Sequence, residues 1–327
     1  MDVIRTEEQT ELATIVRGLL EKRSDSGAVR AAVESEAGFD ASLWSTLCEQ
    51  IGAAALSIPE DLGGAGFSVA ESFVVLEELG RALAPSPLLG SLLAAEALVA
   101  AGDSEAAQRL LPRIAEGEIA TVAFGADNVL FGADADIVLA FVDGALVEVT
   151  DVARTRTPAV DLTLPLARLD LAAATTSPIS DDPAVYERTR DVALVATAAL
   201  QVGTMQRALD DTVTYSKQRV QFGRVIGSFQ ALKHRMADML VRLEMSRSAL
   251  LAASWALSTH DDSATERAAS AASYCSESLW SIAGEMVQLH GGIAITWEHD
   301  AHLVLKRAHS LGALFGQAHE HRARIAL

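Results

Sequence analysis

The chain from Ala184 to its C-terminus repeats its apolar residues with the period of an α-helix. Apolar side chains at i, i+3, i+4 and i+7 line one face of a helix, and that face must be buried against another element. Four such stripes follow one another, and four helices with one apolar face each pack as an antiparallel bundle. The sequence therefore predicts a four-helix bundle over residues 183–327. The stripes are Val195–Val213, Leu232–Leu243, Ala268–Met286 and Leu303–Phe315.

The chain before the bundle divides into a helical part and a short β part. Residues 1–117 show helical periodicity broken by glycine- and proline-rich loops. Residues 118–182 carry short β-branched and aliphatic runs, with Asp143-Gly144 as a hairpin signal between two of them. We expect a mostly α protein with an N-terminal helical domain (1–117), a small antiparallel β domain (118–182) and the bundle. The expected strands are Thr121–Phe124, Ile137–Val142, Ala145–Val149 and Leu162–Leu166.

The composition excludes several classes of partner and setting. The formal net charge is −18 and the sequence pI is about 4.8, whereas nucleic acids and anionic membranes attract basic surfaces. The apolar run Leu88–Ala101 is too short to span a bilayer and contains Glu96, so we expect a core helix there. Cys48 and Cys275 lack metal-ligand spacing, which favours buried free thiols in a reducing cytoplasm. Because the N-terminus does not resemble a signal peptide, we expect a cytoplasmic protein that binds neither nucleic acid nor membranes.

Two turns at predicted helix ends are candidate binding sites. In the first turn, the guanidinium of Arg219 can hold a phosphate through paired hydrogen bonds, and Phe222 offers a flat face to a planar ring. In the second turn, Gln288 precedes Gly291 and Gly292, where the backbone can approach a ligand closely. Each feature also has a plainer explanation, since an arginine near a helix C-terminus interacts with the helix dipole and paired glycines stop a helix.

The segment after the second turn is rich in histidine and acidic residues. It contains Glu298, His299, Asp300 and His302. Their spacing fits no strong zinc pattern, so we predict a helix cap and an ion-paired surface there, and no metal site.

Together, these motifs resemble those of the acyl-CoA dehydrogenase family. The resemblance rests on Arg-Val-Gln-Phe-Gly (219–223), Gly-Ser-Phe-Gln-Ala-Leu-Lys-His (227–234), Gln-Leu-His-Gly-Gly (288–292), Pro-Glu-Asp-Leu-Gly-Gly-Ala-Gly (59–66) and Glu-Glu-Leu-Gly-Arg (77–81). It covers nearly the whole chain and implies the family's fold, in which a middle β domain lies between a helical domain and a four-helix bundle. It also implies the family's chemistry, in which FAD takes a hydride and a carboxylate takes a proton to form an α,β-unsaturated acyl-CoA.

The resemblance gives the two turns a specific role. In the family, the Arg and Phe of the first turn and the Gln and second Gly of the second bind the dinucleotide of a neighbouring subunit's FAD. The matching residues here are Arg219, Phe222, Gln288 and Gly292. One position departs from the pattern, because Ala294 stands where members commonly have a third glycine.

The catalytic positions do not match the family. Its base is a Glu in a Tyr-Glu-Gly-Thr-like turn, and the corresponding Leu-Phe-Gly-Gln turn here has Phe315, which cannot accept a proton. In some members the Glu opens the first bundle helix instead, a position that falls on Ala193 or Leu194. Glu187, about two helical turns upstream, remains as an alternative base. The sequence therefore predicts no catalytic residue in this chain.

The middle domain also departs from the family pattern. Members hold the flavin ring with a Thr-Glu-Pro-x-x-Gly-Ser-Asp loop followed by a Trp-containing segment. This chain reads Thr-Val-Ala-Phe-Gly-Ala-Asp from Thr121, and no tryptophan occurs between Trp44 and Trp255. Both elements that hold the flavin ring are therefore missing.

These departures predict a shortened, base-lacking subunit that pairs with a homologous Glu-bearing chain, most simply as α2β2. Its two turns would complete the partner's FAD site, and the partner would bind most of the acyl-CoA. Such divided pairs resemble actinobacterial acyl-CoA dehydrogenases that act on steroid side-chain CoA thioesters, which suggests the substrate class. Two alternatives stay open: a self-sufficient homo-oligomer with a displaced base such as Glu187, and a structural or regulatory subunit that binds no flavin.

Overall fold

The N-terminal part of the protein is helical, as its periodicity predicts. The computed structural model describes residues 4–325, so the first three and last two residues of the predicted outer domains lie outside the description. Side chains cap several helix starts: the hydroxyl of Thr6 accepts from the backbone of Gln9, and the Asp25 carboxylate accepts from Ala28. The helical elements are α1 (Glu7–Arg23), α2 (Ser26–Glu34), α3 (Ala41–Thr46), the π-helical turn η1 (Leu47–Ile51), the 3₁₀ turn η2 (Glu60–Leu62), α4 (Val69–Ala82), α5 (Leu88–Ala100) and α6 (Glu105–Ala115).

The middle part forms two small sheets. One has the strand order β1-β3-β4-β7 and the other β2-β6-β5. Asp143 and Gly144 join β3 to β4 with positive φ angles of 50° and 85°, as the hairpin signal predicts. The strands are β1 (Ala120–Ala123), β2 (Val129–Leu130), β3 (Ile137–Val142), β4 (Ala145–Thr150), β5 (Arg154–Thr157), β6 (Leu166–Leu169) and β7 (Thr175–Ser180).

Two predictions for this middle part are wrong. The larger sheet is mixed, because β1 and β3 run parallel. The connection between them passes through β2, which pairs in the other sheet, and this crossover returns β3 in the direction of β1. The stretch predicted as the strand Leu162–Leu166 is a turn over most of its length, and β6 begins only at Leu166. In that turn the carboxylate of Asp161 accepts from the backbone and hydroxyl of Thr163, a local bonding pattern that competes with a strand.

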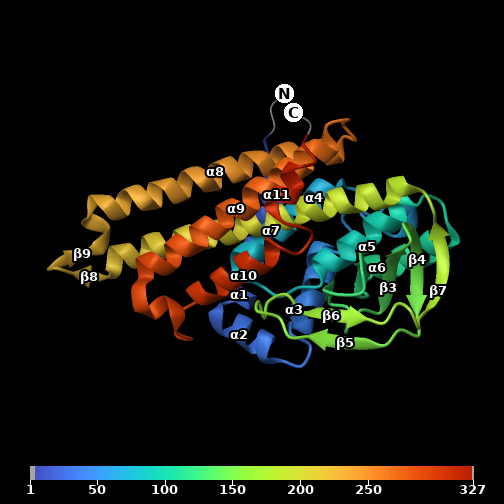
Figure 1. Cartoon of the computed structure of the whole chain (residues 1–327), viewed down its shortest axis with the longest axis horizontal. Helices are drawn as coiled ribbons and strands as arrows, with labels where there is room; N and C mark the ends of the chain where they lie inside the picture. The colour runs from blue at the N-terminus through green and yellow to red at the C-terminus, as the bar shows by residue number, and fades with distance from the viewer. Residues whose placement is uncertain (1–3, 326–327) are drawn as a thin grey trace.

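The C-terminal part is dominated by three long helices that run side by side (Figure 1). They are α7 (Pro183–Gln218), α8 (Gln230–Ser258) and α9 (Ala264–His290), followed by the shorter α10 (Ala301–Leu311) and α11 (Ala318–Arg322). Helix α10 packs on α7 and α9 and completes the bundle. The fourth predicted stripe ends early, since α10 stops at Leu311 and Phe315 lies beyond it. The predicted divisions at 117–118 and 182–183 fall in the connections between α6 and β1 and between β7 and α7.

The N-terminal helices and the bundle share one hydrophobic core through a close crossing of α4 and α7. A Cβ at Gly203 would lie 1.8 Å from the carbonyl oxygen of Glu77, and a Cβ at Gly80 would lie 2.3 Å from that of Leu200. Only glycine permits this approach of two helix backbones. Helix α7 is long and apolar enough to cross a membrane by composition alone, but 89% of its most apolar window is buried inside the fold. The apolar character of α7 is therefore explained by its place in the core.

Candidate functional site

The first candidate turn forms a short hairpin at one end of the bundle. Helix α7 ends where Arg219 leaves the helical conformation, and β8 (Val220–Gln221) pairs with β9 (Arg224–Val225). Phe222 and Gly223 join them with φ angles of 53° and 77°, so the phenylalanine ring projects outward and is 91% exposed. The hairpin extends beyond the ends of the long helices (Figure 1). Within residues 4–325 nothing bonds or pairs with the exposed Arg219 guanidinium, so this group is available to an anion from outside the chain.

The second candidate turn ends α9. Helix α9 stops at His290, and Gly291 has a φ of 65°, which explains the glycine there. Gln288 and Gly292 are both exposed, and no atom lies within 4 Å of a Cβ placed on Gly292. The chain continues as the 3₁₀ turn η4 (Gly291–Ile295), in which Ala294 is fully buried and does not have a positive φ. The third glycine of the family pattern is therefore not needed for the path of this loop.

The structure brings the two turns to the same end of the bundle. Tyr215, one helical turn before Arg219, stacks on His290 with ring centroids 4.4 Å apart. Its hydroxyl donates to the carbonyl oxygen of His290 at 3.3 Å. The four residues predicted to bind FAD thus come from adjacent helix ends, and the contact that joins these ends was not part of the sequence prediction.

The position of the missing base lies within a cluster of aromatic rings, which we call the aromatic cluster. Phe315 packs on Phe124 with ring centroids 5.5 Å apart and planes at 69°. Phe124 also contacts Phe141 at 5.4 Å and Tyr186 at 5.8 Å, and the last two rings are 5.0 Å apart. Phe124 lies in the stretch that departs from the family's flavin loop. Aromatic rings therefore occupy both the base position and the adjoining loop of this chain.

The aromatic cluster and the two turns lie at opposite ends of α7. Tyr186 is in the first turn of this helix, whereas Arg219 follows its last residue. At 1.5 Å per residue, the intervening helix is about 50 Å long, which is far more than one dinucleotide spans. No single FAD can therefore contact both the turns and the base position of the same chain.

The alternative base positions offer little support for proton transfer. Ala193 and Leu194 are buried and carry no acid group. Glu187 is about half exposed, and its carboxylate pairs with Arg190 at 2.6 Å and with Arg324 at 3.5 Å. The Glu187 carboxylate is therefore already engaged in ion pairs with two arginines of its own chain.

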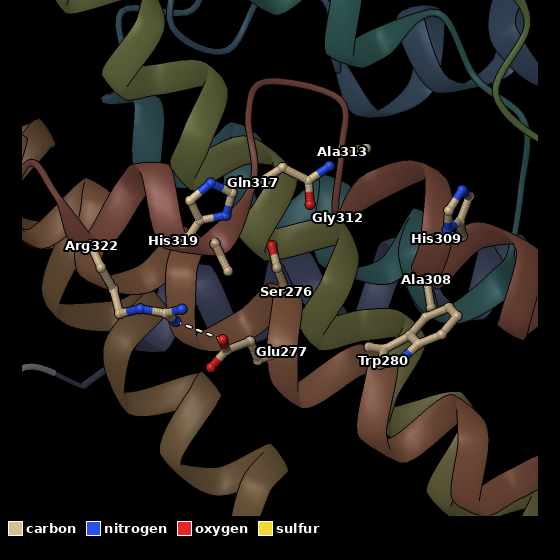
Figure 2. A pocket seen from close by; sticks show the side chains of 11 residues that line it. Ser276, Glu277, Trp280, Ala308, His309, Gly312, Ala313, Gln317, His319 and Arg322 are labelled. Atoms are coloured by element: carbon tan, nitrogen blue, oxygen red, sulfur yellow. Dashed lines mark hydrogen bonds and ion pairs between the residues drawn. The ribbon is translucent and has the colours of Figure 1, made fainter.

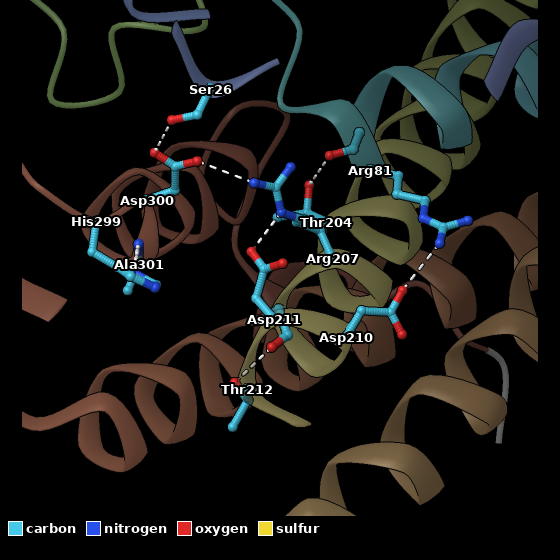
Figure 3. A network of polar contacts seen from close by, with 12 residues as sticks. Ser26, Arg81, Thr204, Arg207, Asp210, Asp211, Thr212, His299, Asp300 and Ala301 are labelled. Carbon is cyan, nitrogen blue, oxygen red and sulfur yellow. Dashed lines mark hydrogen bonds and ion pairs between the residues drawn. The ribbon is translucent and has the colours of Figure 1, made fainter. Parts of the chain in front are cut away.

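Asp300 corrects the prediction of an ion-paired surface after the second turn. This residue is only 9% exposed, and it links α2 to α7 (Figure 3). Ser26 and Arg30 donate to one carboxylate oxygen at 2.7 and 2.6 Å, and Arg207 donates to the other at 3.1 Å. Burial opposes ionisation, but these hydrogen bonds and positive charges outweigh it and lower the pKa of the Asp300 carboxyl. Asp300 therefore fastens the segment that follows the second turn to two domains.

The histidines near Asp300 contact neighbouring groups of the chain. Within residues 4–325, no group of three or more His, Cys, Asp or Glu residues is arranged to hold a metal ion. The Nδ1 atom of His299 accepts from the backbone of Ala301 at 3.1 Å, and the ring of His302 packs on Trp297.

A separate groove of about 390 Å³ lies between α9 and the segment that joins α10 to α11 (Figure 2). Trp280 and His309 lie on one side, and the ion pair between Glu277 and Arg322 lies on the other. Neither Phe315 nor any of the four predicted FAD-binding residues lines this groove. It is therefore distinct from the candidate cofactor turns.

Comparison with known proteins agrees with this architecture. Residues 6–118 match the N-terminal domain of acyl-CoA dehydrogenases, and residues 178–326 match the C-terminal domain. The chain is 46% identical over 324 residues to acyl-CoA dehydrogenase IpdE2 of Mycolicibacterium smegmatis, and the match covers 98% of both proteins.

Two solved structures extend the likeness to complexes. A chain of the ChsE4-ChsE5 complex from Mycobacterium tuberculosis superposes with a TM-score of 0.89 at 28% identity, covering 99% of this chain and 97% of the other. A chain of the Tcur3481-Tcur3483 steroid ACAD (G363A variant) gives a TM-score of 0.88 at 28% identity, covering 98% and 96%. The mostly helical fold with small β sheets, the two domain matches and the near-complete alignment to IpdE2 show that this chain belongs to the acyl-CoA dehydrogenase family of CH–CH oxidoreductases.

Proposed function

We propose that this chain is the base-lacking subunit of a heteromeric acyl-CoA dehydrogenase, in which its two turns complete an FAD site on a homologous Glu-bearing subunit. The observation that carries the proposal is the separation along α7. The exposed turns lie at one end and the aromatic cluster lies at the other, which supports a role of the turns toward a flavin held by another subunit. Phe315 at the base position supports a partner that carries the missing Glu. The simplest assembly is α2β2.

The chemistry of the two turns fits the dinucleotide part of FAD. The Arg219 guanidinium can pair with pyrophosphate oxygens, and the exposed ring of Phe222 can stack on a planar base. The Gln288 amide can donate a hydrogen bond, while Gly292 leaves open space for close approach of a ligand. FAD, when bound, accepts the hydride from the acyl-CoA. The proton acceptor and the flavin-ring contacts would come from the partner.

Exposed apolar side chains support association with another subunit. Val220 and Phe222 on the hairpin and Ile295 and Trp297 beside the second turn are all more than half exposed. A second apolar set lies along α8 and α9. It comprises Leu240, Val241, Met245 and Trp280. Apolar patches of this kind, with tryptophan and methionine, are typical of protein interfaces.

We further propose that the heteromer desaturates a steroid side-chain CoA thioester in the cytoplasm. The substrate class is supported by likeness to a structure described as a steroid ACAD and to the ChsE4-ChsE5 complex. The cytoplasmic location is supported by the two free cysteines, because thiols stay reduced in that compartment. We also propose that the three domains of the chain divide at 117–118 and 182–183.

The test is co-purification of the chain with a homologous Glu-bearing subunit, followed by measurement of bound FAD. We expect Arg219→Ala to lower FAD affinity by about tenfold or more, because a hydrogen bond to a charged group is lost. Arg168→Ala is the matched control, since Arg168 is an exposed arginine on β6 outside the turns. Unchanged FAD content in the Arg219→Ala heteromer would exclude the cofactor role.

The two alternative functions give different results in the same experiment. A self-sufficient homo-oligomer would yield a yellow protein that desaturates acyl-CoA without a partner, and Glu187→Gln would abolish that activity. A structural or regulatory subunit would leave the flavin content of the partner unchanged on assembly.

A further inference from the structure

Three rings in mutual contact join the two turns at the end of the bundle, and we call them the aromatic clamp. Tyr215 lies in the last turn of α7, His290 ends α9, and His299 follows η4. The His290 ring centroid is 4.4 Å from that of Tyr215 and 4.4 Å from that of His299, and Tyr215 meets His299 edge-on at 6.3 Å. The clamp therefore contacts the helix before the first turn and both sides of the second.

The hydrogen bonds of His290 fix its tautomer. Its Nδ1 lies 2.7 Å from the carbonyl oxygen of Met286, which can only accept, so Nδ1 carries the hydrogen. In the neutral ring, Nε2 is then a lone pair, and this buried atom has no hydrogen-bond partner among the described residues. His290 itself is only 3% exposed. The clamp thus holds a neutral imidazole in a site that has no acceptor for a second ring hydrogen.

We propose that Tyr215 and His290 are positioning residues that set the spacing of the Arg219 and Gly292 turns and thereby the affinity for the dinucleotide. Tyr215 lies one turn before Arg219, and His290 lies two residues after Gln288 and two before Gly292. Neither ring needs to touch the cofactor. Asp300 anchors the far end of the same segment, so the loop between His290 and Asp300 is held at both ends. This inference rests on the proposed FAD role of the turns.

A clamp built on neutral His290 makes cofactor affinity depend on pH. Burial lowers the pKa of the His290 imidazole and neighbouring His299 lowers it further, while the Met286 carbonyl and the Asp211 carboxylate act in the opposite direction. Tyr215 is the third group in contact with the ring. As the pH falls through this lowered pKa, His290 gains a buried N–H without an acceptor and a charge next to His299. The stack then loosens, and FAD affinity falls on the acidic side.

The test titrates FAD into the deflavinated heteromer at pH 8 and pH 5.5 and follows flavin fluorescence. Tyr215→Ala removes one stacked pair, so we expect FAD binding about three- to tenfold weaker at pH 8, with kcat at saturating FAD unchanged. His290→Phe keeps a stacked ring that cannot be protonated, so it should reduce the loss of affinity at pH 5.5. Tyr215→Phe, which loses only the hydroxyl donor, should show a smaller effect than Tyr215→Ala.

His309→Phe is the matched control, because His309 is a bundle histidine that contacts Trp280 away from the turns. At each of the two pH values, this variant should bind FAD with the affinity of the wild type. The positioning role is overturned if Tyr215→Ala binds FAD like the wild type, or if His290→Phe keeps the full pH dependence. Arg219→Ala separates the two levels of inference. If that variant loses FAD while the clamp variants do not, only the clamp is wrong, and if it binds FAD normally, the proposed function fails first.

Discussion

The most informative single change restores the family's carboxylate at the base position, as Phe315→Glu. Phe315 is half-buried and makes one edge-to-face contact with Phe124. Half the burial of a phenylalanine and one aromatic pair together stabilise the fold by roughly 1–3 kcal/mol. The substitution should remove this amount and add a carboxyl group to a largely apolar site. We expect a less stable protein and no dehydrogenase activity from this chain alone.

The pH dependence of the stability of Phe315→Glu separates the loss of packing from the cost of burying a charge. The apolar surroundings raise the pKa of the new carboxyl above its value in the unfolded chain, so its ionised form is disfavoured in the native state. The extra destabilisation is therefore small below the unfolded pKa and grows as the pH rises through the folded one. Phe315→Gln is the neutral control. In urea denaturation followed by circular dichroism, the two variants should unfold at similar midpoints at pH 4 and diverge at pH 7.5.

Two results would refute this reasoning. A Phe315→Glu protein as stable as the wild type would mean that Phe315 contributes no packing energy in the aromatic cluster. Flavin-dependent desaturation by the variant without a partner would mean that only the base is missing, and that a second copy of this chain can supply the turns.

Three further predictions follow from other contacts. Gly203→Ala should destabilise the protein by several kcal/mol, because its Cβ would lie 1.8 Å from the Glu77 carbonyl oxygen, and urea denaturation measures this loss. Asp300→Asn should lower the free energy of unfolding by roughly 2–4 kcal/mol at pH 7. Because the folded pKa of Asp300 is lowered, the difference in stability between this variant and the wild type should shrink as the pH falls below about 4. Burial raises the pKa of both Cys48 and Cys275 to about 12, so neither thiol should react with a disulfide reagent at pH 8 until urea unfolds the chain.

The first two of these predictions have a control inside the chain, and the third has an outcome that would contradict it. Gly284→Ala, on a helix where no atom lies within 4 Å of the added Cβ, should be neutral or slightly stabilising. Asp238→Asn changes an exposed carboxylate of α8 and should leave the free energy of unfolding at pH 7 close to that of the wild type. Rapid labelling of native Cys48, the less buried thiol, would show that η1 opens locally.

Much of the fold could be predicted from the sequence because it depends on periodicity and local backbone chemistry. The apolar stripes predict the long helices, and Asp143-Gly144 predicts the hairpin that joins β3 to β4. Sequence periodicity failed to predict the structure where the pairing of distant segments determines it. The parallel contact of β1 with β3 depends on which sheet takes the intervening β2.

The motif Glu-Glu-Leu-Gly-Arg shows what a motif alone leaves undecided. In the structure its residues are packing and anchoring groups. Glu77 pairs with Arg5, Glu78 pairs with Arg17 at 2.6 Å, and Gly80 permits the crossing of α4 and α7. The sequence identifies such a motif as characteristic, but its physical role follows from partners that lie far away in the chain.

By itself, the sequence determined the residue types at the two turns and the absence of a carboxylate at Phe315, because chemical identity is local. Only the tertiary structure decided that Tyr215 and His290 join the turns and that Phe124 and Tyr186 surround the base position. It also set the two regions about 50 Å apart along α7. Distance and burial arise from packing between segments remote in sequence, and no local pattern encodes them.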